Sequence, residues 1–209
     1  MGGKVDFMNS EQKSVFYVGT FSGYLYVVEF DRDQEELFVI NRVQHSNRPA
    51  YLCLSDNRKF LYTANENSDG LGGVSAYDIS DQYAPKHINT ISFTTEGPCH
   101  VSLTDDQRYL LSAGYFDGRV IVNPVNPDGS LAESSCIIQH QGSGPFRGGT
   151  IVSSQAQARA HFIRQVPGTR YILVTDLGTD KVYVYTLSDG KLIEHSTVTV
   201  APGARSQAF

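Results

Sequence analysis

The chain has 209 residues, of which 40% are hydrophobic and 19% are charged, and its formal net charge is −5 at pH 7. This composition is typical of a folded domain, and no apolar run approaches the length of a membrane span, which excludes intrinsic disorder and a transmembrane helix as the main description. The negative charge and the lack of a basic stripe argue against a nucleic-acid partner.

The chain begins with a polar segment, residues 1–14, which lacks the apolar centre of a secretory signal. Three cysteines follow at scattered positions, Cys53, Cys99 and Cys136. Their number is odd and their spacing is neither that of a disulfide framework nor that of a metal site. Free thiols are ordinary in a reducing compartment, so we expect a cytoplasmic protein.

A short apolar strand ending in a small or polar residue then returns four times. The four copies begin at Val15, Phe60, Tyr109 and Tyr171. Successive copies are separated by 45, 49 and 62 positions, so the third interval carries an insertion. A period in the forties built from β-type strands predicts the blades of a propeller.

Two neighbouring copies align residue by residue. A shift of 49 positions lays residues 49–56 on 98–105 and continues without a gap through Glu66 and Tyr115. Each unit then contains an inner strand, a polar turn and three further strands, which in the second unit are 51–54, 60–64, 74–79 and 87–93. β-branched and aromatic residues are enriched in these strands, and no long pattern of helical period competes. We therefore predict an all-β fold, a propeller of four-stranded antiparallel blades.

The last part of the chain is less regular. Residues 139–157 are rich in glycine and predict a loop. Strands at 182–187 and 191–200 finish the fourth unit, and 202–209 begin another inner strand. We expect residues 15–209 to form a partial propeller of about four blades plus the first strand of another. Because an unclosed ring leaves hydrogen-bonding edges open, we also expect self-association and a tendency to aggregate.

Several phrases in this order and spacing resemble the seven-bladed propeller lactonase family. That family includes the propeller-type 6-phosphogluconolactonases and the fungal carboxymuconate cyclases. The resemblance runs from about Val15 to Phe209 and covers a little over half of the family's ring. Its phrases are Tyr17-Val18-Gly19-Thr20, Arg48-Pro49, Asn65-Glu66, Gly97-Pro98, Ala160-His161 and the run from Val174 to Tyr185.

The resemblance implies opening of a lactone, an internal ester, at the mouth of the central channel. The expected partner is a small anionic sugar-acid lactone of the pentose phosphate pathway, with no metal or other cofactor and no membrane. Ester hydrolysis needs an activated water, a group that stabilises the oxyanion and an anchor for the anionic part of the substrate.

Three residues are expected to be catalytic. A histidine has an ordinary pKa near 6.5 and can act as a base at neutral pH, which makes His161 the leading candidate. Arg205 begins the next inner strand and could hold a phosphate or carboxylate in a bidentate manner. Glu66 could orient water. Four further residues are candidates for substrate binding: His100, Arg159, Asn65 and Arg147.

Each of these side chains also has a structural interpretation. His161 could be a packed inner-strand histidine, Asn65 and Glu66 could be ordinary strand-end residues, and Arg147 and Arg205 could be solvated. In the repeat, His100 aligns with Tyr51 whereas His161 aligns with Cys99. The two histidines are thus one residue out of step, and adjacent positions of a strand face opposite sides.

The chain departs from the family pattern at three positions. Ser154 and Arg159 stand where an arginine and a histidine are usual, and Ser206 replaces another histidine. An arginine cannot act as a base at neutral pH. Two alternatives to an active lactonase therefore stay open, beside an inactive fragment of one: a lactonising cyclase of the carboxymuconate type, and a non-catalytic propeller that binds a protein or metabolite.

Overall fold

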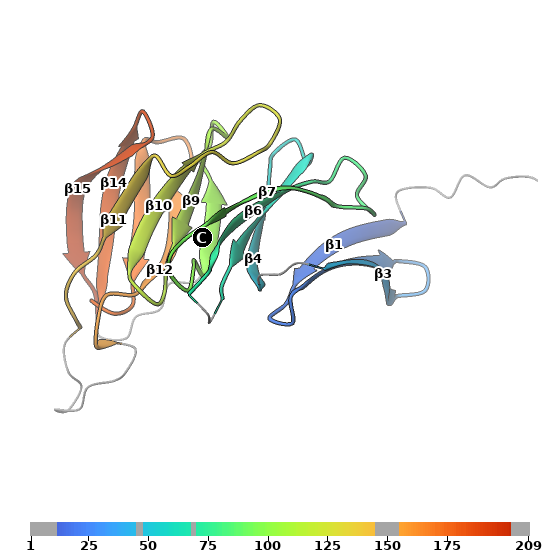
Figure 1. Cartoon of the computed structure of the whole chain (residues 1–209), viewed down its shortest axis with the longest axis horizontal. Coiled ribbons are helices and arrows are strands. Elements are labelled where there is room, and N and C mark those ends of the chain that lie inside the picture. Colours follow the sequence, from blue (N-terminus) through green and yellow to red (C-terminus); the bar gives the residue numbers. More distant parts are fainter. Residues whose placement is uncertain (1–11, 45–47, 68–69, 145–154, 202–209) are drawn as a thin grey trace, which may run out of the picture.

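The structure of the chain, a computed structural model, describes residues 12–44, 48–67, 70–144 and 155–201. These residues form fifteen strands in four antiparallel sheets (Figure 1). No helix within the described ranges is long and apolar enough to cross a membrane. The all-β propeller fold predicted from the repeat is confirmed, with one sheet for each repeat unit.

We call the four sheets blades 1 to 4. Blade 1 contains β1 (Lys13–Gly19), β2 (Tyr24–Asp31) and β3 (Glu36–Gln44). Blade 2 contains β4 (Pro49–Leu54), β5 (Phe60–Asn65), β6 (Gly73–Asp78) and β7 (Lys86–Ser92). Blade 3 contains β8 (His100–Leu103), β9 (Tyr109–Ala113), β10 (Arg119–Pro124) and β11 (Cys136–Gln139). Blade 4 contains β12 (Ala160–Gln165), β13 (Tyr171–Asp176), β14 (Lys181–Ser188) and β15 (Lys191–Thr199).

Blade 1 differs from the predicted four-stranded unit. Its described residues form only three strands, in the order β1-β2-β3. β1 carries the phrase that forms the second strand of the other blades, so no described residue supplies the inner strand of blade 1. β1 also begins at Lys13, two residues before the predicted domain start. The strand predicted from residue 202 onwards lies outside the described residues.

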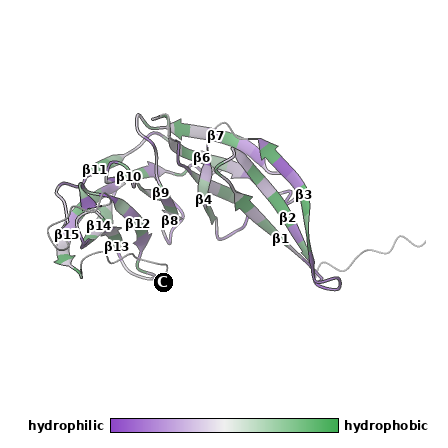
Figure 2. Ribbon diagram, turned by 90° about the horizontal axis from the view of Figure 1, so that it is seen from below, coloured by the Kyte–Doolittle hydropathy of each residue, from purple (hydrophilic) through white to green (hydrophobic). Residues whose placement is uncertain are grey.

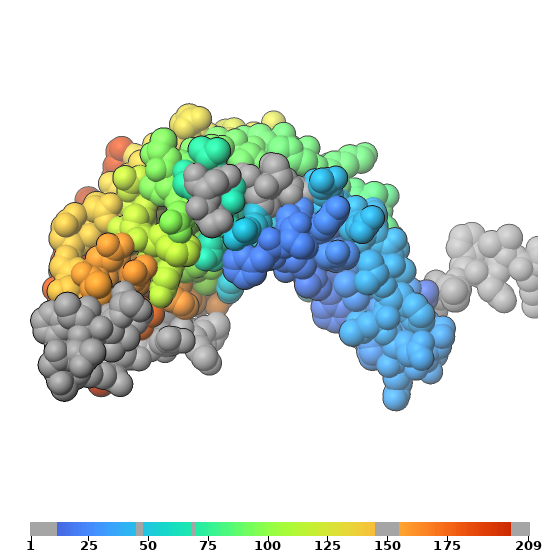
Figure 3. All heavy atoms as spheres, turned by 60° about the horizontal axis from the view of Figure 1, so that its bottom comes forward, coloured from blue at the N-terminus to red at the C-terminus, as the bar shows by residue number. Residues whose placement is uncertain are grey.

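The blades follow one another along an arc. The inner strands β4, β8 and β12 lie on the concave side of this arc, and β7, β11 and β15 lie on the outer side (Figure 2). The space-filling view shows an arch, with blade 1 at one end and blade 4 at the other (Figure 3). Exposed apolar side chains occur at both ends, for example Leu37 and Val39 in blade 1 and Ile193 and Val198 in blade 4.

Alternating side chains explain why these segments are strands. Every second residue of β2 is buried, and Leu25 and Val27 are fully inaccessible. This period of two places one face of each sheet against its neighbour. The β14–β15 hairpin turns at Asp189 and Gly190, whose φ angles are 48° and 73°. Asp-Gly at two positive-φ positions is the preferred sequence of a type I′ turn, which matches the twist of paired strands.

The core is divided among the three interfaces between blades. One apolar cluster, which includes Leu25 and Tyr77, joins blades 1 and 2. A second, which includes Tyr62, joins blades 2 and 3, and a third, which includes Ile163 and Tyr185, joins blades 3 and 4. Each blade therefore depends on its neighbours for burial of its faces, as in other repeat proteins.

Candidate functional site

The candidate site is assembled from positions that recur in successive blades. Glu66, Tyr115 and Leu177 each lie just beyond the second strand of blades 2, 3 and 4. In blade 2, Glu66 N donates a hydrogen bond to Arg48 O (2.9 Å), and in blade 4, Leu177 N donates one to Arg159 O (2.9 Å). The same backbone bond in both blades brings the residue after the second strand beside the start of the inner strand.

A β-bulge at the start of the inner strand sets the direction of His161. Ala160 pairs with Asp176 and Phe162 pairs with Thr175, so His161 is the extra residue of the bulge. Ala50 has the same place in blade 2. A bulge changes the direction of a side chain and is frequent beside active sites.

Cys99 has the corresponding place in blade 3. Its backbone N–H donates to Ala113 O (2.9 Å), and Ala113 also pairs with His100. Cys99 and His161 are therefore equivalent, as the repeat predicted. His100 is one step further along its strand.

These recurring positions converge on one pocket of about 250 Å³. It is lined by Glu66, Cys99, Tyr115, His161 and Leu177, which come from blades 2, 3 and 4. Two of the three predicted catalytic residues, His161 and Glu66, thus lie in the same pocket although they are far apart in sequence. Its chemistry singles it out, because a larger hollow of about 500 Å³ beside Ser55 and Phe60 has no histidine in its lining.

Arg159 lies at the edge of this pocket. Its guanidinium carbon is 4.8 Å from the centre of the Tyr115 ring, and its Nη1 donates to Tyr115 O (3.3 Å). The opposite neighbour of this ring is His161, whose ring centroid is 5.9 Å away in an edge-to-face arrangement. A cation over an aromatic face is attracted by the ring quadrupole, so Tyr115 holds positive charge near the histidine.

Burial controls the ionisation of the other lining residues. Burial raises the pKa of Glu66, the nearby Glu96 raises it further, and Arg48 opposes both effects. Burial, with a contribution from the Glu66 charge, raises the pKa of the Cys99 thiol to about 12. Since the thiolate is the reactive form of cysteine, Cys99 is a neutral wall of the pocket at physiological pH.

His100 lies in a different environment from His161. Its ring stacks between Tyr51 and Phe162, with centroid distances of 4.3 and 4.5 Å. These three rings have the same position in β4, β8 and β12, and they form a row across the inner strands. Only 6% of His100 is exposed, and burial, together with the charges of His161 and Arg164, lowers its pKa to about 4. Its proposed binding role therefore lacks a place in the pocket.

Asn65 is fully buried within blade 2. Its amide oxygen accepts from Thr63 Oγ1 (2.7 Å) and its amide nitrogen donates to Ser75 Oγ (2.7 Å). These bonds are a structural use of the side chain, and they place it beneath the pocket. The predicted residues Arg147 and Arg205 lie outside the described residues.

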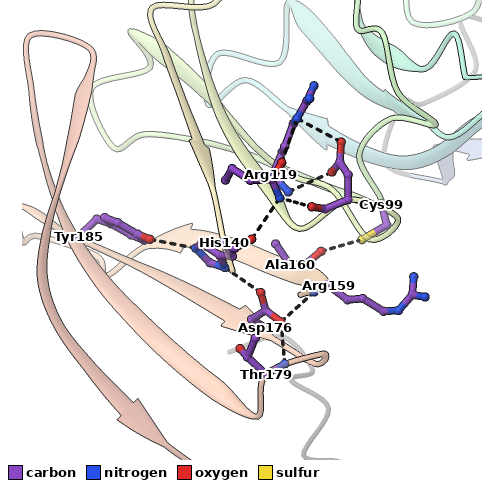
Figure 4. Close-up of polar contacts among 10 residues, drawn as sticks. Cys99, Arg119, His140, Arg159, Ala160, Asp176, Thr179 and Tyr185 are labelled. Carbon is purple, nitrogen blue, oxygen red and sulfur yellow. Dashed lines mark hydrogen bonds and ion pairs between the residues drawn. The ribbon is translucent and has the colours of Figure 1, made fainter. Parts of the chain in front are cut away.

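Sequence reasoning missed a buried polar group directly behind the pocket. His140 follows β11, and its Nδ1 lies 2.8 Å from Asp176 Oδ2 while its Nε2 lies 2.9 Å from Tyr185 Oη (Figure 4). Asp176 Oδ1 accepts from the backbone N–H of Arg159 (2.8 Å) and Thr179 (3.0 Å). Asp176 was visible only as part of a motif, and nothing in the sequence connected it to His140.

Within the described residues, no group of three or more His, Cys, Asp or Glu side chains is arranged to hold a metal ion. The pocket instead offers an imidazole, a carboxyl group and a nearby guanidinium. An imidazole can remove a proton from water, and a guanidinium can stabilise an oxyanion, which are two requirements of ester hydrolysis.

Comparison with known proteins identifies relatives of the chain. The family described as "Lactonase, 7-bladed beta-propeller" matches residues 15–207. A 6-phosphogluconolactonase of Bacillus subtilis is 34% identical over 197 residues, which are 92% of this chain and 54% of that protein. The chain spans about half the length of the curated relatives it matches.

Solved structures show the same relationship. The structure of a candidate 6-phosphogluconolactonase from Bacteroides fragilis superposes with a TM-score of 0.83 at 25% identity, over 95% of this chain and 58% of that one. A protein from Lactobacillus plantarum gives a TM-score of 0.79 at 28% identity, over 90% of this chain and 54% of that one.

Proposed function

The chain belongs to the lactonase family of seven-bladed β-propellers, and on this premise we propose that the protein hydrolyses a sugar-acid lactone of the 6-phosphogluconolactone type in the pocket described above. The single observation that carries the proposal is that His161 and Glu66 lie in one pocket. Its 6-phosphogluconolactonase relatives support the choice of substrate.

In the proposed mechanism, His161 acts as the general base. The neutral imidazole removes a proton from water as the water oxygen attacks the lactone carbonyl carbon. The carbonyl oxygen becomes an oxyanion in the tetrahedral intermediate. Collapse of the intermediate breaks the bond to the ring oxygen, which takes a proton from the imidazolium, and the product is an open-chain hydroxy acid. A base in this role contributes about 10²–10⁴-fold to the rate.

The other pocket residues position the substrate. The Arg159 guanidinium favours negative charge near the pocket, and Glu66 accepts hydrogen bonds from water or from substrate hydroxyls. Arg205 and Arg147 are proposed as anchors for the anionic group of the substrate, which would separate the binding of the phosphate from the reaction at the carbonyl. The protonated Cys99 thiol takes no part as a nucleophile.

The test is the hydrolysis of 6-phosphogluconolactone by the longest polypeptide that contains this chain. Acid release is followed by pH-stat and corrected for spontaneous hydrolysis. We expect His161→Ala to lower kcat by about 10²–10⁴-fold. His195→Ala, which removes an exposed histidine of β15, is the matched control and should retain wild-type activity.

Two results would contradict the proposal in different ways. If His161→Ala hydrolyses the lactone as fast as the wild type, His161 is not the base. If the wild type does not accelerate hydrolysis at all, the activity itself is rejected. Saturable binding of the lactone without turnover would then favour a non-catalytic propeller.

A further inference from the structure

The group Asp176, His140 and Tyr185 joins two blades through side chains that are almost completely buried. The exposed fraction of the side chain is 1% for His140 and 0% for Asp176, and Tyr185 as a whole is 1% exposed. His140 follows the outer strand of blade 3, whereas Asp176 and Tyr185 belong to blade 4. The His140 ring also stacks on Tyr183 at 3.9 Å.

The protonation states of the group follow from its contacts. Burial would raise the pKa of Asp176, but the hydrogen bonds from His140, Arg159 N and Thr179 N outweigh it and hold the pKa below its ordinary value. An ionised carboxylate can only accept, so His140 Nδ1 carries the proton that it donates. Burial raises the pKa of Tyr185, so its hydroxyl stays protonated and donates to His140 Nε2. Every polar atom of the neutral ring is then satisfied.

Stability alone does not account for a charge at this interface. Removing a carboxylate from water is costly, and well-packed apolar residues are often at least as stabilising as a buried ionic group. The rest of the interface between blades 3 and 4 is apolar. In blade 2 the equivalent position is the neutral Asn65, which bonds to side chains of its own blade.

The second oxygen of Asp176 explains where the charge acts. It accepts the N–H groups of Arg159 and Thr179, which lie on either side of the pocket wall at Leu177. Arg159 comes two residues before His161, at the entrance to the bulge. Gly178 allows the two segments to approach, because a Cβ atom there would lie 1.8 Å from Gln157 O. Asp176 therefore fixes the backbone that carries both the cation and the proposed base.

We propose that Asp176, His140 and Tyr185 form a buried relay of positioning residues, which holds the bulge of β12 so that His161 and Arg159 face the pocket (Figure 4). This inference rests on the proposed function for its catalytic consequence. Its structural consequence, the orientation of the His161 ring, does not depend on that function.

The test compares three variants of the same polypeptide. His140→Leu removes both hydrogen bonds, His140→Gln retains an amide that can donate to Asp176 and accept from Tyr185, and Asn123→Ala is the control. Asn123 is buried in β10 and bonds to Ala132 O and Ser134 Oγ, at the end of the strand that is remote from Arg119. It is a buried polar residue whose loss should destabilise the fold without reaching the pocket.

We expect His140→Leu to lower kcat by about 10- to 100-fold while KM changes little, because a misplaced base affects the reaction more than binding. His140→Gln should recover part of this loss. The NMR resonances of the His161 ring should shift in His140→Leu and stay unchanged in Asn123→Ala. The wild type should also show a downfield His140 N–H proton, which the Leu variant lacks.

The outcomes separate the two proposals. If His140→Leu lowers the unfolding midpoint as Asn123→Ala does, but leaves kcat, KM and the His161 resonances unchanged, the relay has only a structural role and the inference is wrong. If the wild type has no lactonase activity but the His161 resonances still shift in His140→Leu, the positioning role stands and the proposed function fails.

Discussion

The pH dependence of stability should depend strongly on His100. Burial, together with the charges of His161 and Arg164, lowers the pKa of His100 from its ordinary 6.5 to about 4. The folded state thus resists protonation that the unfolded chain accepts. Stability is complete above pH 6.5, falls as the pH drops below that value, and stops falling near pH 4, where the folded state is protonated as well.

The magnitude follows from this pKa difference. The full effect corresponds to about 3 kcal/mol, since each pKa unit is worth 1.36 kcal/mol, and roughly 2 kcal/mol of it should be lost between pH 7.5 and pH 5. His100→Phe removes the titrating group and keeps a ring in the row, because Phe162 has the equivalent position in blade 4. The variant loses the hydrogen bond from Ile163 N to His100 Nδ1 (3.4 Å), which costs about 1 kcal/mol at every pH.

The assay is urea unfolding of the wild type and His100→Phe at several values between pH 7.5 and pH 5. The difference in unfolding free energy between the two proteins should shift by roughly 2 kcal/mol in favour of the variant as the pH falls. Tyr51→Phe changes a neighbouring ring without removing a histidine and is the matched control. A pH-independent difference between wild type and His100→Phe would refute the reasoning.

Three further predictions concern the surroundings of the pocket. Gly178→Ala should destabilise the protein by about 1–3 kcal/mol and reduce activity, because the new Cβ would clash with Gln157 O; an unchanged urea midpoint would contradict this close approach. Cys53 and Cys99, whose pKa values burial raises to about 12, should resist a thiol reagent at pH 8 until the protein unfolds, so rapid labelling of the folded protein would count against the described burial. Glu66→Gln should lower activity but raise the melting temperature more at pH 8 than at pH 4, since a carboxyl with a raised pKa destabilises the fold once it ionises; an equal difference at both pH values would show that Glu66 ionises without cost.

The repeat in the sequence was sufficient to predict the blades and their register. Strand alternation is a local property, so the second unit was predicted to within one or two residues at each strand end. The shift of 49 positions also separated His161 from His100, and the strand pairing confirms that separation. The three-stranded blade 1 was not predicted, because the first apolar phrase was treated as the start of a full unit and not as its second strand.

The sequence by itself determined the class of fold, the family and two residues of the candidate pocket, because periodicity and motif order are written along the chain. Only the tertiary structure decided which side chains meet. Glu66 and His161 come together because equivalent ends of blades 2 and 4 face one hollow. Asp176, His140 and Tyr185 meet although His140 lies 36 and 45 residues from its two partners. Contacts between blades depend on how the sheets pack and twist against one another, and no pattern within a single blade encodes them.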